Sequence, residues 1–82
     1  MAFSDREKQQ MCDLKGVGAT VVGRLEQLGF SQLSQLADES ASDITRAIAQ
    51  LMGSSCWHNS PQARAAISAI IELAQRQRDL RP

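Results

Sequence analysis

The sequence predicts an all-α fold, a small orthogonal bundle of about five helices, from its composition and its periodicity. Hydrophobic residues make up 43% of the chain but aromatic residues only 4%, and Ala, Leu, Gln and Arg are abundant, which favours helices over strands. Apolar residues also recur at intervals of three and four, as on one face of a helix. A chain of 82 residues has the size of one domain, so we expect residues 1–82 to form a single domain with a modest core.

The first predicted helix leads into a turn that contains two glycines. Ser4 and Glu7 have the spacing of a capping box, which predicts a helix over residues 5–13. Residues 14–18 then read Leu-Lys-Gly-Val-Gly. Two glycines in three residues allow a sharp turn, with a positive φ where the turn requires it.

The second and third helices are predicted from apolar faces that follow this turn. A helix over residues 19–28 places Val21, Val22, Leu25 and Leu28 on one face. Gly29 then occupies the position of a left-handed C-cap residue. Ser31 can cap a short third helix that carries Leu33, Leu36 and Ala37.

The last two helices are separated by a loop over residues 54–60. The fourth helix carries a stripe of apolar residues at helical spacing and ends at Gly53; the stripe consists of Ile44, Ala47, Ile48 and Leu51. Ser60 and Pro61 are a typical start for the last helix, which is expected to reach about Gln77. One side of that helix carries Ala63, Ala66, Ile67, Ile70 and Ala74, and residues 79–82 are expected to fray.

The turn and the second helix resemble the helix-hairpin-helix motif, in which an apolar residue, a Gly-apolar-Gly turn and a second helix form a compact nucleic-acid-binding unit. The matching residues are Leu14, Gly16, Val17, Gly18, Val22, Leu25, Leu28 and Gly29. The order of elements is similar to that of stand-alone helix-hairpin-helix domains and, more loosely, of sterile-alpha-motif-like (SAM-like) folds. The segment 53–61 and the Ala-rich helix after it also resemble small bacterial helix-hairpin-helix proteins labelled pathogenicity-locus proteins, which implies a bacterial type of protein.

The resemblance implies that N–H groups of the hairpin contact a phosphate of the DNA backbone, as the N-terminus of a helix can do. The residues assigned to this contact are Lys15, Gly16, Val17, Gly18, Thr20 and Arg24. Lys15 and Arg24 would add charge, Thr20 a hydroxyl group, and Val17 would pack and shape the loop. A phosphate contact positions a protein without reading bases, so weak, sequence-independent DNA binding is the leading hypothesis. If Gly18 has a positive φ, we expect Gly18→Ala to weaken binding.

The charge distribution keeps two other functions open. Nine basic and nine acidic residues give a net charge of zero, whereas a nucleic-acid-binding domain usually has a basic face. Residues 1–43 carry a net charge of −3 and residues 44–82 one of +3, so the hairpin lies in the acidic half. The alternatives are an adaptor that binds another protein in a DNA-related assembly, and self-association through the Ala-rich last helix.

The other chemistry-bearing residues do not form a recognisable site. Zinc sites usually combine four ligands in closely spaced pairs, whereas Cys12, Asp13, Cys56 and His58 offer only the short pair Cys56-x-His58. We therefore expect no metal and no cofactor. A disulfide between the two cysteines is disfavoured in a reducing compartment. Trp57 is expected to fill the gap between the last two helices, with stacking on a base or anchoring of a partner as the alternatives.

Enzymatic activity is not expected. His58 lacks the partners of a catalytic triad, and the glycosylases that use this hairpin place a catalytic Asp within a much larger body, which Asp38 and Asp43 do not have. Every apolar run is short, without the pattern of a signal peptide or a membrane span. Together with two cysteines and no export features, this predicts a cytoplasmic protein.

Overall fold

The structure, a computed structural model, describes residues 3–53 and 59–79. These residues form four α-helices and one 3-10 helix, and none of them lies in a strand, so the all-α prediction is confirmed. The elements in chain order are α1 (Asp5–Cys12), α2 (Ala19–Gln27), the 3-10 helix η1 (Leu33–Leu36), α3 (Ala41–Met52) and α5 (Pro61–Asp79). The predicted loop with Cys56, Trp57 and His58 lies outside the described residues, as do residues 80–82 of the predicted tail.

Serine caps define the starts of three helices, and two of these caps, Ser4 and Ser60, are predicted from the sequence. The hydroxyl oxygen of Ser4 accepts the N–H of Glu7 at 3.2 Å, and that of Ser40 accepts the N–H of Asp43 at 3.1 Å. The hydroxyl oxygen of Ser60 accepts the N–H of Ala63 at 3.2 Å. Each bond satisfies an N–H group that has no partner within its own helix. The start of a helix can therefore be predicted from the sequence where it depends on such a local cap.

The C-terminus of α2 forms a Schellman motif. The N–H of Gly29 donates to the carbonyl of Glu26 at 3.0 Å, and the N–H of Phe30 donates to the carbonyl of Leu25 at 3.2 Å. Gly29 has φ +102°, which L side chains rarely adopt, so the predicted C-cap position is confirmed. This motif turns the chain sharply from α2 toward η1.

The predicted third helix is a single 3-10 turn, and its N-cap is Gln32 rather than Ser31. The side-chain oxygen of Gln35 accepts the N–H groups of Ser31 and Gln32, at 2.8 Å and 3.2 Å, and the side chain of Gln32 caps in return. Glutamine amides therefore replace the serine hydroxyl that the sequence suggests. Leu33 and Leu36 are buried, as expected.

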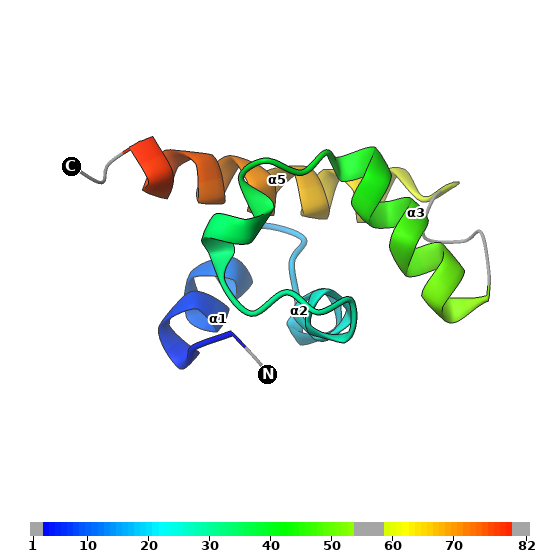
Figure 1. Cartoon of the computed structure of the whole chain (residues 1–82), viewed down its shortest axis with the longest axis horizontal. Helices are drawn as coiled ribbons and strands as arrows, with labels where there is room; N and C mark the ends of the chain where they lie inside the picture. The colour runs from blue at the N-terminus through cyan, green and yellow to red at the C-terminus, as the bar shows by residue number, and fades with distance from the viewer. Residues whose placement is uncertain (1–2, 54–58, 80–82) are drawn as a thin grey trace.

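The hydrophobic core lies between α5 and the other elements. In Figure 1, α5 extends along the top of the molecule while α2 is seen nearly end-on below it, so the two helices run across each other. α5 packs against η1 and α3, and α1 packs against α2. The fully buried large side chains of this core are Met11, Leu25, Leu33, Leu36, Ile48, Ile67 and Ile70. Phe3, which the sequence pattern did not place in the core, is also buried there.

The buried face of α3 differs from the predicted stripe. Ile44 and Ile48 are buried as expected, but Leu51 is 48% exposed and Ala47 is half-buried. Thr45 is fully buried instead, and its hydroxyl stays satisfied because it donates to the carbonyl of Ala41 within the same helix at 2.9 Å. The last turn of α3 extends away from α5 in Figure 1. This direction agrees with the exposure of Leu51, which belongs to that turn.

α5 extends to Asp79, beyond the predicted end at Gln77, because its last turns are tied to other elements. The side-chain amide of Gln77 donates to Gln10 of α1 at 2.8 Å. The Arg78 guanidinium contacts the Asp38 carboxylate at 2.7 Å. Both side chains of this ion pair are largely exposed, so it is worth little by itself, but together these contacts order the end of the helix.

Replacing Gly23 with Ala should stabilise the protein. Gly23 lies inside α2, and a Cβ built there has no heavy atom within 4 Å. Alanine in a helix interior is better than glycine by about 0.5–1 kcal/mol, which raises the Tm of a domain of this size by roughly 2–8 °C. Thermal unfolding followed by circular dichroism measures this shift. Gly29→Ala is the matched control, expected to lower the Tm because its φ is positive; a lower Tm for Gly23→Ala would contradict the placement of Gly23.

Candidate nucleic-acid interface

The turn between α1 and α2 combines one glycine at a positive φ with one buried valine. The N–H of Val17 donates to the carbonyl of Leu14 at 3.2 Å, which closes the turn. Gly16, between them, has φ +83°, so the positive φ expected in this turn lies at Gly16. Val17 is 7% exposed and belongs to the core. Val17 therefore anchors the loop to the core, while Gly16 and Gly18 remain exposed on the surface.

Gly18 has an ordinary extended backbone, so the condition for strain at this residue is not met. Its φ is −122° and its ψ 179°, and it is the N-cap of α2. Its carbonyl accepts the N–H groups of Val21 and Val22, at 3.1 Å and 3.3 Å. Gly18 therefore starts the helix through its backbone rather than through an unusual φ.

Three N–H groups at the start of α2 have no hydrogen-bond partner among the described residues. Within the described part of the chain, no hydrogen bond uses the N–H of Gly18, Ala19 or Thr20, and all three residues are exposed. The N-cap has no side chain to satisfy them, and the first turn contains no acidic residue. These groups carry the positive end of the helix dipole, so the start of α2 is suited to an anion.

In the part of the chain that the structure describes, α1 and α3 also leave the N–H groups of the N-cap and of the first two helical residues without a hydrogen bond, so α2 differs in its cap and its charge. A serine hydroxyl accepts an N–H group at the start of α1, α3 and α5. The first turns of α1 and α3 also contain acidic residues, which repel an anion. Among these four helices, α2 is thus the one whose N-terminus is both uncapped by a side chain and free of acid.

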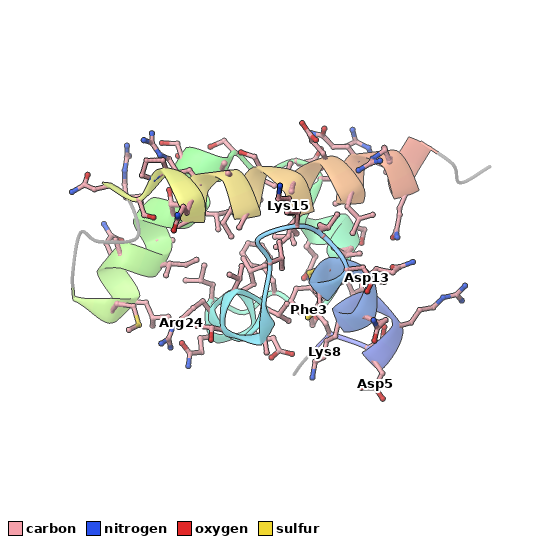
Figure 2. All side chains as sticks on the ribbon, turned by 180° about the vertical axis from the view of Figure 1, so that it is seen from behind. Phe3, Asp5, Lys8, Asp13, Lys15 and Arg24 are labelled. Atoms are coloured by element: carbon pink, nitrogen blue, oxygen red, sulfur yellow. The ribbon has the colours of Figure 1, made fainter. Side chains whose placement is uncertain are left out.

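The two basic residues assigned to the site do not form a cluster. Lys15 is exposed on the loop, whereas Arg24 is half-buried on α2 and donates to the side-chain oxygen of Gln27 at 3.0 Å. Figure 2 labels Lys15 on the loop before α2 and Arg24 at α2 itself, at separate places in the view. Thr20 and Arg24 are four residues apart in α2 and so share a face of the helix. The Nε of Arg24 is buried and has no hydrogen-bond partner.

Acidic residues near the hairpin are already engaged in contacts. The Glu26 carboxylate accepts the N–H of Phe3 at 3.0 Å and lies 3.6 Å from the Nζ of Lys8. Asp13 accepts a hydrogen bond from Gln9 at 2.9 Å, on the exposed end of α1. Asp13 keeps its negative charge close to the turn, which limits how strongly the site attracts a phosphate.

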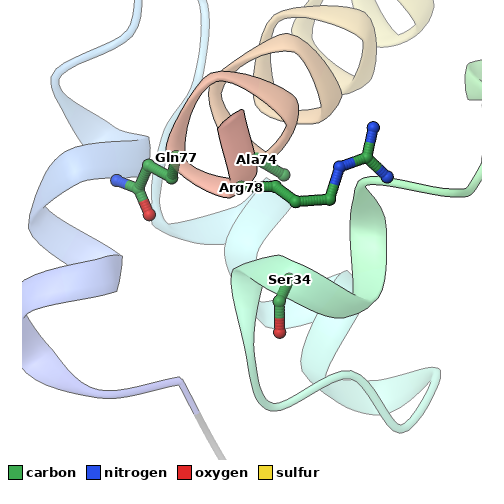
Figure 3. Close-up of a pocket in the computed structure, with 4 residues that line it drawn as sticks. All are labelled: Ser34, Ala74, Gln77 and Arg78. Carbon is green, nitrogen blue, oxygen red and sulfur yellow. The ribbon is translucent and has the colours of Figure 1, made fainter. Parts of the chain in front are cut away.

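The described residues line a groove and a smaller pocket on the surface. A shallow groove of about 250 Å³ runs between α1 and α2 and is lined by Lys8, Cys12, Ala19, Val22 and Glu26. A second pocket, between η1 and the end of α5 (Figure 3), is lined by Ser34, Ala74, Gln77 and Arg78 and has a volume of about 30 Å³. The second pocket is the size of a single water molecule, so it does not suit a larger ligand.

The described residues contain no group of three or more His, Cys, Asp or Glu side chains that could hold a metal ion. Cys12 is an exposed free thiol, and Cys56 and His58 lie outside the described residues. Within residues 3–53 and 59–79, no helix is both long and apolar enough to cross a membrane.

The two glycines of the turn should respond differently to alanine. Gly16→Ala forces an L side chain into a positive φ and should lower the free energy of unfolding by about 1–2 kcal/mol. Gly18→Ala meets open space at an extended backbone position, so it should cost no more than about 1 kcal/mol, the difference between glycine and alanine at an N-cap. Urea unfolding of both variants measures the difference. A larger loss for Gly18→Ala than for Gly16→Ala would contradict this turn geometry.

Comparisons with protein-family models, with curated proteins and with solved structures gave no match for this chain.

Proposed function

We propose that this chain binds nucleic acid weakly and without sequence preference, through a helix-hairpin-helix formed by α1, the turn and α2. The observation that carries the proposal is the start of α2, which has no side-chain cap and no acidic residue in its first turn. Gly18, Ala19 and Thr20 are exposed there, and their N–H groups have no partner among the described residues. A phosphate placed at the start of α2 would accept these groups in the favourable field of the helix dipole.

The residues around the start of α2 have separate roles in this proposal. Gly16 and Val17 hold the turn, and Thr20 adds a hydroxyl donor at the edge of the site. Lys15 adds charge from the loop, and Arg24 adds charge one turn further along α2. Because phosphates are the same in every sequence, such contacts give no base specificity.

The charge of the chain predicts weak affinity. The net charge is zero, so the chain as a whole has no excess charge that attracts a polyanion, and binding depends on a few short-range contacts. Non-specific binding of this kind has a Kd of about 1–100 µM at physiological salt. This range sets the protein concentrations that a test requires.

Fluorescence anisotropy with labelled single-stranded and double-stranded DNA tests the proposal. With two phosphate contacts, affinity should fall about tenfold between roughly 50 and 200 mM salt, because bound counterions are released. Lys15→Gln and Arg24→Gln should each weaken binding and reduce the salt dependence, by about one unit of slope for a lost phosphate contact.

Arginines outside the hairpin provide the matched controls for this experiment. Arg46 of α3 and Arg64 of α5 are both exposed, so Arg46→Gln and Arg64→Gln remove the same charge away from the turn. Affinity should stay within a factor of two of the unmodified protein. No binding at the lower salt, or an equal loss in all four variants, would contradict the proposal.

A protein adaptor is the second candidate function, and exposed apolar side chains at the end of α3 favour it. Leu51 is 48% exposed and Met52 is 43% exposed. Among the described residues, these two are the large hydrophobic side chains that are exposed. Two such residues form a small contact rather than a large apolar patch. Absence of DNA binding at low salt would make this candidate the leading one.

A further inference from the structure

We draw no further inference here: the strongest candidate, the shallow groove between α1 and α2 lined by Lys8, Cys12, Ala19, Val22 and Glu26, combines a lone exposed thiol with a partly apolar floor, and nothing in the described part of the chain shows what would occupy it.

Discussion

Leu25→Ala should lower the free energy of unfolding by about 2–5 kcal/mol, the largest effect expected for a single substitution in α2. Leu25 is fully buried in the core, and removal of its side chain loses transfer free energy and leaves a cavity. A domain of this size has a total stability of roughly 4–12 kcal/mol. Urea unfolding should therefore show a much lower midpoint with an unchanged slope.

Leu51→Ala provides the matched control, because it makes the same chemical change on a helix surface. Leu51 is 48% exposed near the end of α3, so the substitution should change stability by no more than about 0.5 kcal/mol. A loss of stability comparable to that of Leu25→Ala would mean that Leu51 is buried, as the predicted stripe requires. It would contradict the orientation described for α3.

The orientation of α3 illustrates what periodicity can and cannot predict. Spacing alone identified Ile44 and Ile48, which are buried, and it extended the same stripe to Leu51, which is exposed. Burial at a helix end depends on whether a neighbouring element reaches that far, and this is a property of the packed chain. The burial of Thr45 was also missed, because the predicted stripe contains apolar residues only. Its hydroxyl can be buried since it is satisfied by its own helix.

Contacts between residues far apart in the sequence could not be predicted from local patterns either. The Glu7 carboxylate, expected to complete a capping box, accepts the N–H of Leu33 at 2.9 Å. Glu26 holds the N–H of Phe3, which places this aromatic side chain in the core. Each bond joins residues more than 20 positions apart, and neither has a signal in the spacing of nearby residues.

The candidate site was predictable in position but not in detail. A Gly-apolar-Gly segment before an apolar helix located the turn, and the same pattern indicated that its N–H groups are accessible. The sequence does not distinguish Gly16 from Gly18, because either residue can take a positive φ. Only the closed turn from Leu14 to Val17 assigns that role to Gly16 and leaves Gly18 as an extended N-cap.

Thr20→Glu should change stability and DNA affinity in opposite directions. Thr20 is exposed in the first turn of α2, which contains no acidic residue, so a carboxylate there should stabilise the protein by about 0.3–1 kcal/mol through the helix dipole. The same carboxylate would occupy the region of the proposed phosphate. It would compete for charge-assisted hydrogen bonds worth about 1.5–3 kcal/mol each, so DNA affinity should fall at least about tenfold, as measured by anisotropy at low salt.

Ser42→Glu separates this local effect from the change in net charge. Ser42 is the second residue of α3, as Thr20 is of α2, and it is also exposed. Both variants lower the net charge by one, but only Thr20→Glu places the new charge at the hairpin. A tenfold loss of DNA affinity in Thr20→Glu, with nearly unchanged affinity in Ser42→Glu, would assign DNA binding to the start of α2. Unfolding could not explain that loss, because Thr20→Glu is expected to be the more stable protein. Equal losses would mean that net charge alone governs binding, and unchanged affinity in Thr20→Glu would mean that DNA is bound elsewhere.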